Sequence, residues 1–130
     1  MHAKSYFAHL LGHAAPAEFK SAASGHSEDS FLLEWTSMSY TPIEEFRLEI
    51  SLSPGGSWKS FTVVPSKEGA YHFAGKQFLP DLLPATPYSA RVTAKNGEGW
   101  GSPGPIWNFA TKGAGRFINK CFVTLFVFNA

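Results

Sequence analysis

The chain has 130 residues, enough for one domain with a single hydrophobic core. Apolar residues make up 44% and aromatic residues 15%, so the chain can bury enough surface to fold, which excludes general disorder. The formal net charge is +1 with both signs interspersed, which provides no basic surface for phosphates and argues against nucleic-acid binding.

Residues 1–15 are expected to form an N-terminal extension, the only part of the chain where a helix is plausible. Its apolar stretch is interrupted by His9 and His13 and matches a secretory signal poorly. On a helix these two imidazoles would share one face and could hold zinc. The glutamate that follows the first histidine in metalloproteases and a clear third ligand are both missing, so we expect a solvated segment without a metal.

Short extended segments separated by clusters of Gly, Pro and Ser follow this extension. They comprise residues 18–23, 31–35, 43–51, 58–64, 71–73 extending toward Phe78, 88–96 and 106–111. The alternation is clearest where Phe46, Leu48 and Ile50 are interleaved with charged residues. Seven such segments predict an all-β, seven-stranded antiparallel Greek-key β-sandwich with an immunoglobulin-like fold. The expected core residues are Trp35, Phe46, Leu48, Tyr88, Val92 and Phe109.

The segment Leu82-x-Pro84-x-Thr86-x-Tyr88 places a rigid turn directly before a strand that begins with tyrosine. In Greek-key sandwiches such a tyrosine bonds through its hydroxyl to the backbone a few residues upstream. We therefore predict a tyrosine corner at Tyr88.

Residues 99–104 satisfy the G-x-G-x-x-G pattern of dinucleotide-binding loops. A phosphate-binding loop needs a strand before it and a helix after it. Here Pro105 and a strand-like segment follow, and no acidic residue after Glu98 is present to bind a ribose. The pattern instead predicts a glycine-rich turn between two antiparallel strands, and no cofactor.

Several spaced features together resemble a fibronectin type III domain over residues 16–112. They are Trp35, the tyrosine-corner segment 82–88, the run Arg91-Val92-x-Ala94-x-Asn96-x-x-Gly99-x-Gly101-Ser102, and Phe109-x-Thr111. Residues 40–46 (YTPIEEF) also resemble modules that follow immunoglobulin domains in invertebrate neural adhesion proteins. The Arg-Gly-Asp tripeptide by which some family members bind integrins is absent.

This resemblance implies a non-catalytic module of a cell-surface adhesion or receptor-like protein, located outside the cell and acting in protein–protein interaction and spacing. Two alternatives are an intracellular structural spacer of a muscle-type giant protein and an accessory domain of a carbohydrate-active enzyme. The latter requires an attached catalytic domain, which this chain does not contain.

A few residue combinations in the chain have the side chains that catalysis uses. Glu44, Glu45 and Glu49 are carboxylates in one neighbourhood, but Arg47 lies among them as in a solvated, mixed-charge strand face. No His/Asp arrangement that the sequence can connect accompanies Ser60, Ser89 or Ser102, and Cys121 has no nearby base in the sequence. No enzyme is expected.

Trp100 lies on the glycine-flanked turn and is not needed for the core. It either stacks on Arg91 or another cation of the neighbouring strand, the interpretation we favour, or is presented to a partner. The candidate partner-binding residues are the outward side chains of the same sheet: Glu45, Arg47, Glu49, Arg91, Lys95 and Trp100.

Residues 113–130 form an apolar tail with one lysine in the stretch FINKCFVTLFVF. This stretch is too short for a spanning helix, and its spacer and tail are short for a lipid-anchor signal. We expect an added strand or the terminus of a partial chain, so membrane association would require an anchor that is not clearly present. Cys121 is the single cysteine, so no internal disulfide can form.

Overall fold

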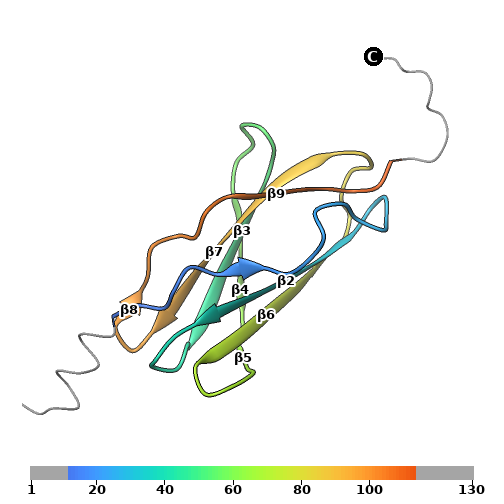
Figure 1. Cartoon of the computed structure of the whole chain (residues 1–130). Helices are drawn as coiled ribbons and strands as arrows, with labels where there is room; N and C mark the ends of the chain where they lie inside the picture. Colours follow the sequence, from blue (N-terminus) through green and yellow to red (C-terminus); the bar gives the residue numbers. More distant parts are fainter. Residues whose placement is uncertain (1–11, 114–130) are drawn as a thin grey trace, which may run out of the picture.

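A computed structural model describes residues 12–113, which form a sandwich of two antiparallel sheets (Figure 1). The first sheet has the order β1 (Glu18–Phe19), β2 (Phe31–Met38), β6 (His72–Leu79) and β5 (Ser66–Lys67). The second has the order β4 (Lys59–Val63), β3 (Glu45–Leu52), β7 (Pro87–Asn96) and β8 (Gly99–Trp100), and β9 (Trp107–Ala110) also pairs with β7. The predicted all-β sandwich is confirmed.

The number of strands and their limits differ from the sequence prediction. Nine strand segments form within residues 12–113, whereas seven were expected. The predicted opening strand 18–23 ends at Phe19, since the chain then leaves the first sheet and reaches the second. There Gly25 donates its backbone N–H to the Ala110 carbonyl, and Ser24 forms a parallel bridge with Ala110. The opening segment therefore joins the two sheets and covers the free edge of β9.

Two further short strands were predicted as turns. Ser66 and Lys67 pair with β6, and Gly99 and Trp100 pair with the end of β7. Both strands have two residues, too few for a period-two pattern to be recognised in the sequence.

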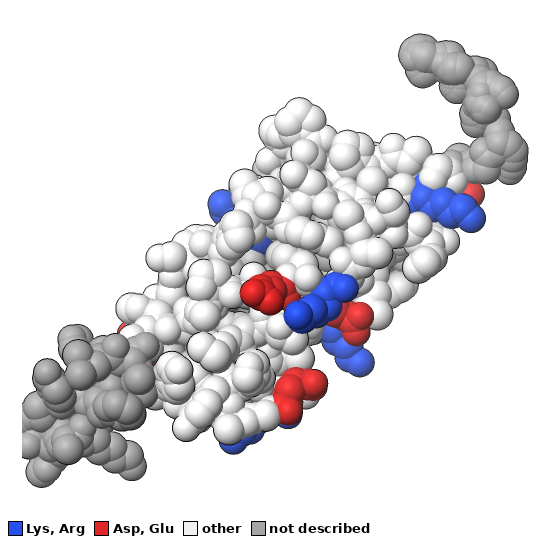
Figure 2. All heavy atoms as spheres, in the orientation of Figure 1, with Lys and Arg blue, Asp and Glu red and all other residues white. Residues whose placement is uncertain are grey.

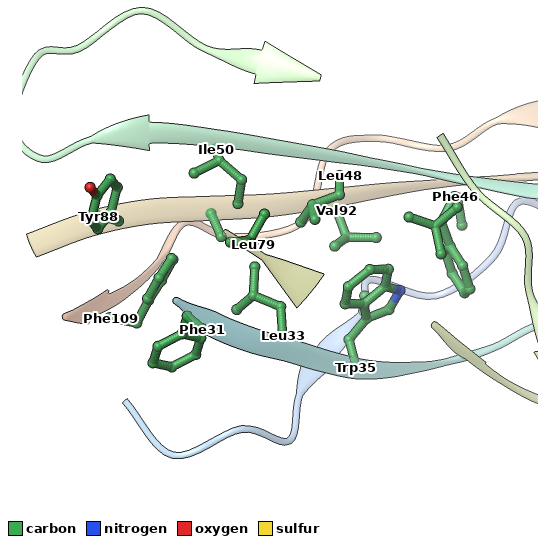
Figure 3. Packing of buried hydrophobic residues seen from close by; sticks show 14 of the residues in the cluster. Phe31, Leu33, Trp35, Phe46, Leu48, Ile50, Leu79, Tyr88, Val92 and Phe109 are labelled. Atoms are coloured by element: carbon green, nitrogen blue, oxygen red, sulfur yellow. The ribbon is translucent and has the colours of Figure 1, made fainter. Parts of the chain in front are cut away.

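The core lies between the sheets and consists of residues that alternate with exposed ones along each strand (Figure 3). In β2 the inward residues are Phe31, Leu33 and Trp35, and in β3 they include Phe46 and Leu48. The six predicted core residues are all buried, which confirms that prediction: Trp35, Phe46, Leu48, Tyr88, Val92 and Phe109. Period-two alternation on amphipathic strands therefore decided which side chains entered the core.

The tyrosine corner is present at the start of β7. The backbone N–H of Leu83 donates to the Tyr88 hydroxyl at 2.8 Å, and the Tyr88 ring stacks on Phe109 at 5.6 Å between centroids. This bond satisfies the hydroxyl of a buried ring and fixes the loop before β7. The sequence prediction is confirmed.

Candidate functional site: the outer face of the second sheet

The six candidate binding residues come from β3, β7 and β8 of the second sheet. The strand register places Glu45 opposite Lys95, Glu49 opposite Arg91, and Lys95 opposite Trp100. Because these residues alternate with the buried ones, their side chains share the outer face. The structure thus brings them together on one surface, whose role in binding stays a prediction.

Trp100 stacks against two cations, Arg47 of β3 and Lys95 of the neighbouring strand β7. The Arg47 guanidinium carbon lies 4.2 Å from the centre of the Trp100 ring, and the Lys95 ammonium lies 5.9 Å from it. Arg91 lies four residues before Lys95 on β7, about 13 Å along the strand, so it does not meet this ring. Trp100 is partly buried, and stacking accounts for its position.

Arg91 is held by two other side chains of the same face. Its guanidinium carbon lies 4.2 Å from the centre of the Trp58 ring, and its Nε donates to Glu49 Oε1 at 2.9 Å. Trp58 was missed as a member of this surface. Ser60 pairs with Glu49 and Thr62 pairs with Arg47, and both of these β3 residues face outward. Trp58 lies two residues before Ser60, so alternation along the segment places its side chain on the same outer face. This alternation is the sequence signal that could have identified Trp58.

These contacts form two clusters on one face, which together we call the outer stack. Trp58, Arg91 and Glu49 make up the first cluster, and Arg47, Trp100 and Lys95 make up the second. Planar guanidinium groups covering indole rings lose little additional side-chain entropy on binding a partner. The outer stack is therefore an ordered polar and aromatic surface.

The loop that carries Trp100 is organised by Asn96, which is buried at the end of β7. Asn96 Oδ1 accepts the backbone N–H of Glu98 at 2.9 Å, and Nδ2 donates to Ser39 Oγ at 3.0 Å. Gly99 follows with φ of 105°, a conformation that glycine adopts without strain. The segment after the glycines continues into strand β9, so the predicted turn between antiparallel strands is confirmed.

Two of the residues that could have supported catalysis have structural partners. The Glu49 carboxylate pairs with Arg91, and the Ser89 hydroxyl donates to Asn108 Oδ1 at 2.8 Å. Within residues 12–113 no group of three or more His, Cys, Asp or Glu side chains could hold a metal ion. In the same range, no helix has the length and apolar character needed to cross a membrane.

Several sequence predictions concern residues outside the described range. His9, Cys121 and the apolar tail beyond Gly113 are among them. Within the range, the His13 ring nitrogen Nε2 lies 3.1 Å from the Glu98 carbonyl oxygen.

Separate replacement of Arg47 and Trp100 by alanine, followed by the double replacement, is expected to reveal a coupling of about 0.5 to 1 kcal/mol in unfolding free energy. Urea denaturation followed by circular dichroism measures it. Arg91→Ala with Trp100→Ala is the matched control and should show no coupling, because Arg91 covers Trp58. Coupling of Trp100 to Arg91 but not to Arg47 would contradict the observed stacking.

A two-sheet antiparallel sandwich with a tyrosine corner and a glycine-rich final hairpin defines an immunoglobulin-like β-sandwich module. The sequence model of the fibronectin type III domain matches residues 14–109, and the chain belongs to this family. Fibronectin type III domains are generally non-catalytic structural modules for protein interaction and spacing.

Solved structures share the fold at low sequence identity. A structure described as a myokine has 17% identity and a TM-score of 0.59, covering 75% of this chain and 96% of that one. The fibronectin type III domain of the human collagen alpha-1(XX) chain has 22% identity and a TM-score of 0.55, covering 81% and 91%. The domain derived from human KIAA0970 protein has 20% identity and a TM-score of 0.53, covering 92% and 90%. No curated protein sequence matches the chain.

Proposed function

We propose that this chain is a non-catalytic module of a cell-surface adhesion or receptor-like protein, located outside the cell, and that it spaces neighbouring parts and binds protein partners. Membership of the fibronectin type III family supports the module role. The likeness of Tyr40–Phe46 to modules of invertebrate neural adhesion proteins supports the adhesion role. In this segment Ile43 and Phe46 are buried, whereas Tyr40 is exposed and contacts Tyr71 at 4.9 Å between ring centroids.

The observation that carries the spacing role is the position of the two ends of the domain. The first described residues lie beside β8, with Gly101 next to His13 and Ala14, and the chain leaves after β9 at the opposite end of the sandwich (Figure 1). A domain entered at one pole and left at the other can be joined in series with others without folding back. The same geometry serves an intracellular spacer of a muscle-type giant protein, which is the second candidate.

For partner binding we propose the outer stack. Its centre is aromatic and arginine-rich, a composition enriched at protein interfaces, and Glu45 and Lys95 add polar groups at one end. Because the arginines are already held on rings, the surface is preorganised. The partner would be a protein with hydrogen-bond acceptors complementary to the guanidinium edges.

Antibody labelling of intact cells that express the full-length protein tests the location. Labelling without permeabilisation is expected, and labelling only after permeabilisation would instead favour the intracellular spacer.

A charge reversal tests the outer stack as a binding surface. Arg47→Glu should abolish binding of the purified chain to cells that bear its partner. Lys67→Glu, which reverses an exposed charge on β5 of the other sheet, is the matched control and should leave binding intact. Equal binding by both variants would contradict the assigned surface.

A further inference from the structure

The outer face of the first sheet carries exposed apolar side chains. Leu32 on β2 is 46% exposed and Phe78 on β6 is 55% exposed, and the two residues lie directly opposite each other in the strand register. Met38 is also exposed at the far end of β2. Paired exposed apolar residues on an ordered sheet face indicate an interaction surface.

Charged residues lie next to this apolar pair. Glu34 is opposite Lys76 in the same register, and both side chains are exposed. Over residues 12–113 neither forms an ion pair, whereas Lys20 on the chain next to β2 lies 3.7 Å from Glu18. Figure 2, in the orientation of Figure 1, shows a surface largely free of charge, with acidic and basic side chains next to each other near its centre.

We propose that this face binds a second copy of the same chain. In this dimer the two-fold axis runs parallel to the strands and lies between β2 and β6. Each β2 residue of one copy then faces, in the other copy, the β6 residue that is its cross-strand neighbour within the sheet. Leu32 then meets Phe78 of the other copy, and Glu34 meets Lys76. Apolar groups meet apolar groups, and opposite charges meet each other on both sides of the axis.

The charges select this orientation over the other symmetric one. A two-fold axis across the strands through the same row would place Glu34 against Glu34 and Lys76 against Lys76. Like charges in direct contact are unfavourable.

The size of the face sets the strength of the dimer. The face has two strands of eight residues and two strands of two residues. With strands about 4.8 Å apart and a rise of about 3.3 Å per residue, it presents about 300 Å² per copy. About 600 Å² in total is smaller than the interfaces of stable complexes, so we expect a weak, reversible dimer with a dissociation constant of about 1 mM. The outer stack lies on the other sheet and stays accessible in this dimer.

Sedimentation equilibrium of the full 130-residue chain tests the proposal. The wild-type chain should associate reversibly, and Glu34→Lys and Lys76→Glu should each weaken self-association at least about tenfold, because like charges then face each other. An equimolar mixture of these two variants should form a heterodimer, since the basic face of one meets the acidic face of the other. If the variants failed to self-associate because they were unfolded, mixing them would not restore association. Circular dichroism checks that both variants are folded.

The apolar end is tested with a matched pair of substitutions. Phe78→Lys should weaken dimerisation at least about tenfold. Ile106→Lys, at a residue 56% exposed on the loop before β9, should leave it unchanged. Three results would overturn the proposal. They are a wild-type chain that stays monomeric at all concentrations, a mixture of the two charge variants that does not associate, and equal effects of the two lysine substitutions.

Discussion

Replacing Trp35 by alanine is expected to lower the free energy of unfolding by about 3 to 5 kcal/mol. Trp35 is 1% exposed and spans the space between the sheets, where its ring meets Phe46 edge-on at 5.6 Å between centroids. It also meets the Phe19 ring at 6.1 Å, so it touches side chains from both sheets. Since small domains are stable by only about 5 to 15 kcal/mol, the loss is a large fraction of the total.

Urea denaturation followed by far-ultraviolet circular dichroism measures this effect. Trp58→Ala is the matched control, because Trp58 is partly exposed and contributes mainly its stacking with Arg91. It should cost no more than about 1 kcal/mol. Similar losses for the two tryptophans would contradict the assignment of Trp35 to the core.

Replacing Gly75 by alanine is expected to destabilise the domain by about 1 to 3 kcal/mol, because the interior has no room for another methyl group. Gly75 lies opposite Trp35 in the β2–β6 register. A Cβ atom there would lie 2.5 Å from Trp35 Cε2 and Cζ2. Gly75 and Trp35 are both buried, so either the Trp35 ring or strand β6 must move to make room for the added methyl group.

A double-mutant cycle isolates this close approach. In a Trp35→Phe background the smaller ring should make room, and Gly75→Ala should cost less by about 0.5 to 3 kcal/mol. The substitution also removes Trp35 Nε1, a buried donor without a hydrogen-bond partner among the described residues. Gly69→Ala is the control, since its nearest neighbour would be 3.7 Å away. Additive effects of the two core substitutions would show that the predicted clash is absent.

The sequence by itself determined the local features of this protein. Inward and outward residues follow from alternation along one strand, as for Phe46, Leu48 and Arg47, and the bond at Tyr88 spans only five residues. The final glycine-rich hairpin was also predictable, because its turn and both arms are neighbours in the chain. These features need no knowledge of how distant strands align.

Only the tertiary structure decided which distant residues meet. The pairing of Trp100 with Arg47, and of Trp58 with Arg91 and Glu49, depends on the register between β3, β4, β7 and β8. The shortening of the first strand depends on the path of the chain from one sheet to the other. The match of Leu32 with Phe78 and of Glu34 with Lys76 depends on strands more than 40 residues apart. Side-chain alternation selects a face, but a shift of the partner strand by two residues would keep every face and change every contact, so the pairs arise only when the whole sandwich packs.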